Sequence, residues 1–175
     1  MTANSIMSSQ QEVTTRYGKV LAVRPVSAED EAALADFFDR VSDEDRRFRF
    51  FTPRKHLTHE QLVPLVEVDH VQTEGFLAID EETGAVVSHA MLACDKQLDT
   101  GEIAVAVCSN WRGKGVGWAM LDVLADAGRA RGLRRVIAIE DRDNHAAIEL
   151  EREKGFTPHG VDGDPHVVML EKLLA

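Results

Sequence analysis

The sequence predicts one α+β domain, and three observations lead to that prediction. Segments with the apolar pattern of strands alternate with segments in which apolar residues recur at helical spacing. Capping residues mark where helices begin, and glycines mark where they end. The 175 residues are 44% hydrophobic and contain no internal repeat, low-complexity stretch or clear linker, so a single core accounts for the chain.

Three helices are expected in the N-terminal part, after a first strand over Val20–Pro25. Each begins at a Ser or Thr that is followed three positions later by Asp or Gln, the spacing of a capping box, and these residues are Ser27, Ser42 and Thr58. Pro64 lies inside the third helix and should bend or shorten it, because proline removes a helical hydrogen bond.

Strands predominate in the rest of the chain. A hairpin is expected to join Gly75–Asp80 to Ala85–Cys94, with Gly84 free to adopt a positive φ in the turn. The remaining elements, in order, are strand Glu102–Cys108, helix Gly115–Arg131, strand Arg135–Glu140, helix Asn144–Lys154 and strand His166–Leu173.

The first residues of the chain are polar and lack the apolar segment of a secretory signal. We expect residues 1–17 to be a flexible N-terminal segment and residues 18–175 to form the domain. No apolar run reaches the roughly 20 residues that a membrane-spanning helix needs. The expected location is cytoplasmic, with no membrane partner.

Composition limits the classes of partner. The formal net charge of -10 and the pI of about 5.1 argue against nucleic-acid binding, which needs excess Lys and Arg, and are compatible with a cationic substrate. Cys94 and Cys108 both lie in apolar runs, so we expect reduced, buried thiols and no disulfide. No Cys/His cluster has the spacing of a zinc site, and no metal is expected.

The most informative stretch is RGKGVG, residues Arg112–Gly117, between a strand and the long helix. The first N–H groups of a helix lack internal partners, and the helix dipole makes that end electropositive. Such an end binds anions, above all phosphate, and glycines let the backbone approach the phosphate oxygens. Arg112 and Lys114 add positive charge. We therefore expect a diphosphate at this turn.

Three other interpretations compete with a diphosphate site of this kind. A nucleotide-triphosphate P-loop needs GxxxxGK followed by Ser or Thr, which the sequence lacks. A dinucleotide fold needs GxGxxG; Glu140 could serve as its ribose contact, but only 35 residues follow Glu140, too few for a second half of that fold. A glycine turn that binds nothing is the third.

The motif at Arg112–Gly117 resembles the Q/R-x-x-G-x-G/A signature of the GCN5-related N-acetyltransferase (GNAT) superfamily. The preceding IAVAV strand and the later segment Asn144–Phe156 also match that family, and the resemblance covers most of the chain from about Val20. The segments that begin VRPVSAED and GEIAVAVC resemble the acetyltransferase domain of bacterial protein-lysine acetyltransferases. Those often carry a fused acyl-CoA synthetase-like or cyclic-nucleotide-binding domain, which we do not expect within these 175 residues.

The resemblance implies the GNAT fold, a central twisted mixed sheet with flanking helices in which the strands at 102–108 and 135–140 run parallel and splay apart. It implies acetyl-CoA as cosubstrate, with pantetheine pairing with exposed strand backbone. The Val107 N–H would polarise the thioester carbonyl as an oxyanion-hole donor. The residues expected to bind the cofactor are Val105, Val107, Arg112, Gly113, Lys114, Gly115, Val116, Gly117 and Asn144.

Glu102 is the expected general base. An alkyl amine has a pKa of about 10.4 and must lose a proton before it attacks a thioester. Glu102 begins a strand whose same face carries the small residues Ala104 and Ala106, and the resemblance places the catalytic Glu of lysine acetyltransferases here. The alternative is a solvated carboxylate at a strand end.

No general acid is assigned. Many family members have a Tyr acid where this sequence has Glu151, and the one Tyr of the chain is Tyr17. A thiolate with a pKa of about 8.5 can leave with help from water, so the missing Tyr need not abolish transfer. Cys108 adjoins the site and is expected to pack rather than to act as a nucleophile.

The predicted function is acetyl-CoA-dependent transfer of an acetyl group to a primary amine by direct attack, with a protein lysine favoured over a small amine. The alternative is a CoA- or acyl-CoA-binding sensor without catalysis, which the missing Tyr suggests. The sequence leaves open the acceptor, the preferred acyl chain and the oligomeric state.

Overall fold

Eight strands form one mixed sheet in the computed structural model, which describes residues 10–51 and 54–174. The spatial order is β1-β2-β3-β4-β5-β6-β8-β7, and every neighbouring pair is antiparallel except β5 and β6. The strands are β1 (Gln11–Thr14), β2 (Val20–Pro25), β3 (Thr73–Asp80), β4 (Val86–Cys94), β5 (Thr100–Val107), β6 (Arg135–Asp141), β7 (Thr157–Val161) and β8 (Asp164–Leu173).

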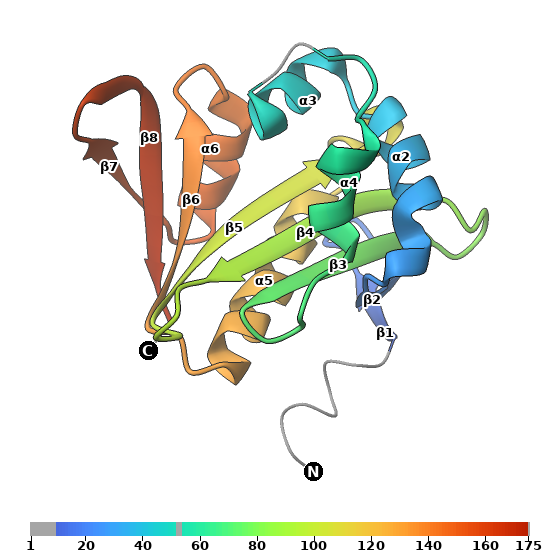
Figure 1. Cartoon of the computed structure of the whole chain (residues 1–175), viewed down its shortest axis with the longest axis horizontal. Coiled ribbons are helices and arrows are strands. Elements are labelled where there is room, and N and C mark those ends of the chain that lie inside the picture. The colour runs from blue at the N-terminus through green and yellow to red at the C-terminus, as the bar shows by residue number, and fades with distance from the viewer. Residues whose placement is uncertain (1–9, 52–53, 175) are drawn as a thin grey trace.

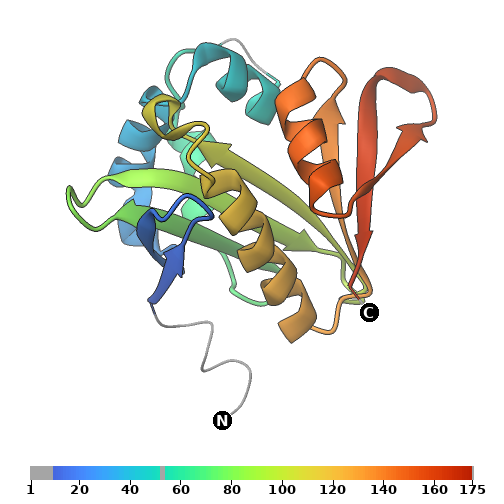
Figure 2. The ribbon, with the colours of Figure 1, turned by 180° about the vertical axis from the view of Figure 1, so that it is seen from behind.

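Helices cover both faces of this sheet, which confirms the expected α+β class. α2 (Glu31–Asp39) and α4 (His59–Val66) lie over the face seen in Figure 1, and α5 (Val116–Ala130) and α6 (His145–Glu153) lie over the face seen in Figure 2. α3 (Asp43–Phe50) lies near the top of α6 in Figure 1. Two 3₁₀ turns, η1 (Ala28–Asp30) and η2 (Ser109–Trp111), precede α2 and the glycine-rich turn.

The expected helix starts are present. The Ser42 hydroxyl accepts from the Asp45 N–H at 3.1 Å, and Thr58 caps α4 in a reciprocal box with Gln61. At Ser27 the box opens η1, and α2 follows it. Pro64 lies within α4, which ends two residues later, in agreement with a shortened helix.

The core lies between the sheet and its helices. α5 packs on β4 and β5, and its inner stripe includes Met120, Leu121 and Leu124, which are nearly or fully buried. Phe37 and Phe38 of α2 are buried on the opposite face. Their rings pack edge to face, with 4.9 Å between the ring centroids. These two layers clamp the middle strands, so β5 is held rigidly where it borders the site.

The parallel pair β5 and β6 splays apart, as the resemblance implies. Their register consists of Thr100 with Arg135, Gly101 with Val136 and Glu102 with Ile137. Beyond Glu102 the two strands diverge: β5 stays paired with β4, and β6 stays paired with β8. This leaves a wedge-shaped gap in the middle of the sheet, with one strand edge of β5 facing it.

Two strands were not expected from the sequence. β1 falls within the segment predicted to be flexible, yet it pairs with β2 along its length, so the sheet begins before residue 18; residues 1–9 lie outside the described part. β7 contains Pro158 and Gly160, two residue types that are rare in strands and that therefore argue against a strand in the sequence. β7 is an edge strand, and an edge strand tolerates both. The signal for β7 is Asp162-Gly163, a two-residue hairpin turn before β8.

None of the helices in the described ranges is both long enough and apolar enough to cross a membrane.

Candidate active site

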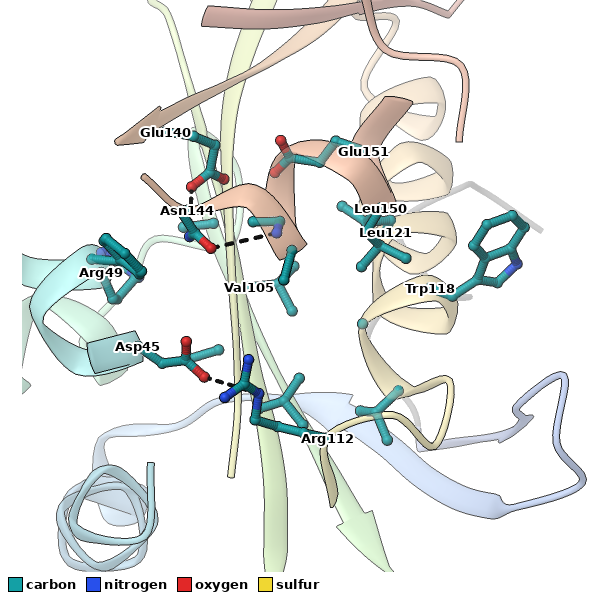
Figure 3. A pocket seen from close by; sticks show the side chains of 18 of the residues that line it. Asp45, Arg49, Val105, Arg112, Trp118, Leu121, Glu140, Asn144, Leu150 and Glu151 are labelled. Carbon is teal, nitrogen blue, oxygen red and sulfur yellow. Dashed lines mark hydrogen bonds and ion pairs between the residues drawn. The ribbon is translucent and has the colours of Figure 1, made fainter. Parts of the chain in front are cut away.

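A cavity of about 460 Å³ fills the gap between β5 and β6. Its wall is built by β5, β6, α3, α6, the first turn of α5, the glycine-rich turn and the hairpin between β1 and β2. Figure 3 shows Arg112 and Asp45 at one end of it and Glu140 and Glu151 at the other. The sequence predicted all but the α3 and hairpin contributions.

The β5 backbone presents its polar groups to this cavity. The Cys108 N–H donates to the Val87 carbonyl of the β4 side at 3.0 Å, so the groups of Cys108 point toward β4. In an antiparallel ladder the direction alternates from residue to residue. The N–H and C=O groups of Val105 and Val107 therefore point into the gap, where no β6 partner meets them in the described register.

The turn after η2 opens the long helix with free amides. Gly113 and Gly115 adopt φ of 74° and 83°, values that favour glycine. The first helical bond of this end runs from the Ala119 N–H to the Gly115 carbonyl at 3.1 Å. Residues 116–118 thus begin the helix without intrahelical acceptors for their N–H groups. The free N–H groups are therefore those of Val116, Gly117 and Trp118. Trp118 is not among the residues expected from the sequence to bind the cofactor.

Gly115 has a structural role besides its conformation. A Cβ at this position would come within 3.1 Å of Tyr17 and 3.2 Å of Thr15. The glycine therefore lets the β1–β2 hairpin lie against the turn, rather than clearing space for a ligand directly. Arg16 and Tyr17 of that hairpin line the cavity, although the sequence placed them in a flexible segment.

Positive charge gathers on the same side. Arg112 lines the cavity, and its Nε lies 3.4 Å from an Asp45 oxygen. Lys114 is not among the described lining residues; its ammonium group lies 5.0 Å from the centroid of the Trp111 ring. Instead the Arg16 guanidinium lies 4.3 Å from the Trp118 ring centroid, which makes Arg16 a cation of the cavity that sequence reasoning missed.

Glu102 lines the cavity with an exposed side chain. It is the last β5 residue paired with β6, so it marks the point where the gap begins. The structure therefore brings the expected base into the same cavity as the amide-rich turn.

Arg49 of α3 is the main functional candidate that the sequence did not reveal. Its side chain is half-buried with a buried Nε, and burial lowers the pKa of Arg49, while the carboxylates of Glu102 and Glu140 act in the opposite direction. Its Nε has no hydrogen-bond partner among the described residues. An arginine within the aromatic run RRFRFF is the sequence signal that could have indicated a buried cation.

The wall formed by β6 and α6 carries three polar side chains, of which Glu151 is buried and Glu140 and Asn144 are half-buried. Asn144 caps α6 by accepting from the Ala147 N–H at 3.4 Å, as predicted, and its Nδ2 donates to Glu140 Oε2 at 3.3 Å (Figure 3). Burial raises the pKa of the Glu140 carboxyl. Burial, followed by the effect of neighbouring Glu140, raises the pKa of Glu151 well above its usual range.

Neither a metal cluster nor a reactive thiol is apparent here. The described residues contain no group of three or more His, Cys, Asp or Glu that could hold a metal ion. Cys108 is fully buried in the core, and burial raises the pKa of its thiol, which leaves it a packing residue. Cys94 is a free, half-buried thiol.

Comparisons with known proteins agree with this geometry. A model of the acetyltransferase (GNAT) family matches residues 31–156. A curated acetyltransferase of Pseudomonas aeruginosa is 27% identical over 143 residues, which are 79% of this chain and 76% of that one. The crystal structure of the GNAT domain of S. lividans PAT is 28% identical, with a TM-score of 0.87 over 94% of this chain and 97% of that one.

A second similar structure was solved with a ligand. It is a phosphinothricin acetyltransferase from Sinorhizobium meliloti in complex with acetyl-CoA, 20% identical, with a TM-score of 0.71 over 88% of each chain. At that identity the likeness is one of fold. The family match spans most of the chain, including the splayed strands and the amide-rich turn. The chain therefore belongs to the GNAT family of acetyltransferases and is an N-acetyltransferase.

Proposed function

We propose that this enzyme transfers the acetyl group of acetyl-CoA to a primary amine by direct attack, with a protein lysine as the favoured acceptor. One observation carries the proposal. A single cavity runs from the free amides of α5, past the unpaired edge of β5, to the carboxylate of Glu102. Its parts would thus bind an anion, an extended amide-containing chain and a cationic amine in one line.

The residues of the cavity suit coenzyme A. The N–H groups of residues 116–118 and the guanidinium of Arg112 would hold the diphosphate. Val105 and Val107 would hydrogen-bond the pantetheine amides, with Asn144 on the facing wall. Lys114 would contribute its backbone N–H, together with Gly113 and Gly115, because its side chain is engaged with Trp111.

The position of the thioester follows from strand geometry. Residues of a strand rise about 3.3 Å each, so Val105 lies about 10 Å and Val107 about 17 Å from Glu102 along β5. The resemblance assigns the thioester carbonyl to the Val107 N–H. The spacing favours Val105 for that role and Val107 for pantetheine, because the attacking amine must reach both the carbonyl carbon and Glu102.

Glu102 would act as the general base. Its carboxylate is open to solvent and lines the cavity, so it can accept a proton from an ammonium group directly or through one water. The neutral amine then attacks the carbonyl carbon, and a backbone N–H stabilises the oxyanion. No covalent intermediate with the enzyme is required.

A cationic acceptor suits the acidic chain rather than the cavity alone, whose three arginines, Arg16, Arg49 and Arg112, offset its carboxylates. Asp45, Glu102 and Glu140 all line the cavity, and the whole chain has a net charge of -10. The S. lividans domain, from a bacterial protein acetyltransferase, supports a lysine in a protein as the acceptor. A small amine would meet the same carboxylates but no extended surface.

The test is to incubate the purified protein with isotope-labelled acetyl-CoA and a cell lysate, and to search peptides and small amines for label by mass spectrometry. We expect labelled lysine side chains and stoichiometric release of free CoA thiol. A protein that binds acetyl-CoA by calorimetry, yet releases no thiol with any lysate fraction or amine, contradicts the proposal and would favour the sensor alternative.

A further inference from the structure

Two carboxyl groups, the half-buried Glu140 and the buried Glu151, lie together in the cavity and have no part in the base step. Glu140 comes from β6 and Glu151 from α6, and Figure 3 shows them next to each other above Asn144. The residue Glu151 is only 6% exposed, and its Oε2 is buried without a hydrogen-bond partner among the described residues. A carboxylate left in that state would be costly.

The side chains around the pair favour different protonation states of the two carboxyl groups. Asn144 Nδ2 donates to Glu140, and the Arg49 cation also favours its charged form. Glu151 has no such donor, and the nearby Glu140 charge disfavours a second negative charge. Two carboxyl groups in one buried site share a proton, and here the surroundings assign it to Glu151. The other charged side chains that line the cavity are Arg16, Asp45, Arg49, Glu102 and Arg112.

The helix places this proton along the expected path of the cofactor. Asn144 and Glu151 are seven residues, two turns, apart on the same face of α6, and both line the cavity. At about 1.5 Å per residue, Glu151 lies about 10 Å from Asn144 along the helix. A pantetheine chain that passes Asn144 on its way from the α5 amides would thus bring its sulfur end toward Glu151.

We propose that Glu151 is the proton donor to the departing sulfur and that Glu140 is the positioning residue that keeps the proton on it. The proposal rests on the proposed function. When the tetrahedral intermediate collapses, the C–S bond breaks and its electron pair goes to sulfur. The Glu151 O–H gives its proton to that sulfur, which leaves a free thiol and a Glu151 carboxylate. The amine nitrogen loses its protons to Glu102 and water, and solvent returns one proton to Glu151.

The decisive comparison is between Glu151→Gln and Glu149→Gln. Glutamine has nearly the same shape but cannot transfer an acidic proton, and Glu149 is an exposed glutamate of the same helix. We expect Glu151→Gln to lower kcat about 30-fold or more, within the range of general acid catalysis, with KM for acetyl-CoA changed less than threefold. Glu149→Gln should behave like the wild type.

The pH profile separates acid catalysis from a structural role. An acid must be protonated to act, so kcat of the wild type should fall at alkaline pH. Glu151→Gln should lose that alkaline decrease and keep the acidic limb that the base sets. A purely structural role would lower the whole profile without changing its shape.

A second measurement does not depend on the variant being folded. Infrared spectroscopy of the wild type at neutral pH should show the C=O stretch of a buried protonated carboxyl group. Its absence, or a Glu151→Gln enzyme with unchanged kcat and an unchanged alkaline limb, overturns the proposal while transfer by the wild type stands. A wild type that releases no thiol with any amine overturns the proposed function, and this step falls with it.

Discussion

The two walls of the cavity differ in kind. The β5 wall offers backbone groups, those of Val105 and Val107, with one exposed carboxylate at Glu102. The wall formed by β6 and α6 offers polar side chains that interact with one another, namely Glu140, Asn144 and the buried Glu151. The first wall suits any extended amide chain, whereas the second holds two carboxyl groups whose ionisation depends on their surroundings.

This difference shows how one residue type can serve two opposite roles. A carboxylate in contact with water can take a proton from an incoming ammonium group and pass it to solvent. A carboxyl group that is buried beside another carboxyl keeps its proton and can donate it. In this enzyme Glu102 and Glu151 are in those two situations, within a single cavity.

Glu102→Gln should have the largest effect. Without a carboxylate on the β5 wall the ammonium group is not deprotonated, so we expect kcat to fall about 100-fold while acetyl-CoA affinity stays within a few-fold. Steady-state kinetics and calorimetry measure the two quantities, with Glu81→Gln on the exposed β3–β4 turn as the control. Normal turnover of this variant with every active substrate would show that Glu102 is not the base.

Gly115→Val tests the backbone end of the same wall. A side chain at φ 83° costs about 1–2 kcal/mol, and this Cβ would also push against Thr15 and Tyr17. We expect acetyl-CoA affinity to fall at least tenfold in calorimetry, because the turn and its amides shift. Gly84→Val is matched, since it has φ 74° and open space around it. If both variants fold and bind acetyl-CoA equally well, the turn does not hold the phosphates.

The pH dependence of stability tests the β6–α6 wall without any substrate. The folded pKa of Glu151 is raised, so its contribution is fully present below the unfolded pKa of about 4.3 and is lost as pH rises through the folded value. Over that window the free energy of unfolding should fall by up to about 1.4 kcal/mol per pH unit for this group.

Glu151→Gln should remove this slope, and Glu149→Gln should keep it. Urea unfolding at several pH values between 5 and 9 measures the difference. Equal slopes in the two variants would mean that Glu151 is ionised in the folded protein, and the contrast between the walls would disappear.

Arg112→Gln should have the smallest effect. The guanidinium is half-exposed and already pairs with Asp45, so water and salt screen its attraction for a diphosphate. We expect acetyl-CoA affinity to fall two- to fivefold, and to depend less on salt than in the wild type. Arg134→Gln, an exposed arginine paired with Asp99, is the control. A hundredfold loss would show that this side chain, rather than the helix amides, holds the phosphates.

Local chemistry explains which elements could be predicted. Neighbouring residues in the sequence determine three of these features. They are the caps at Ser42 and Thr58, the apolar stripe of α5 and the hairpin at Gly84. β1 and β7 were missed because each is a short edge strand whose pairing partner, rather than its own pattern, makes it a strand.

The sequence by itself determined the helix caps, the glycine turn with its free amides, and the position of Glu102 near the start of β5. The tertiary structure decided what surrounds each charge. Arg49, Glu140 and Glu151 are far apart in the chain, and only folding removes them from water and sets them around one cavity. The physical reason is that desolvation and charge–charge interaction depend on distance in space, which no local pattern encodes.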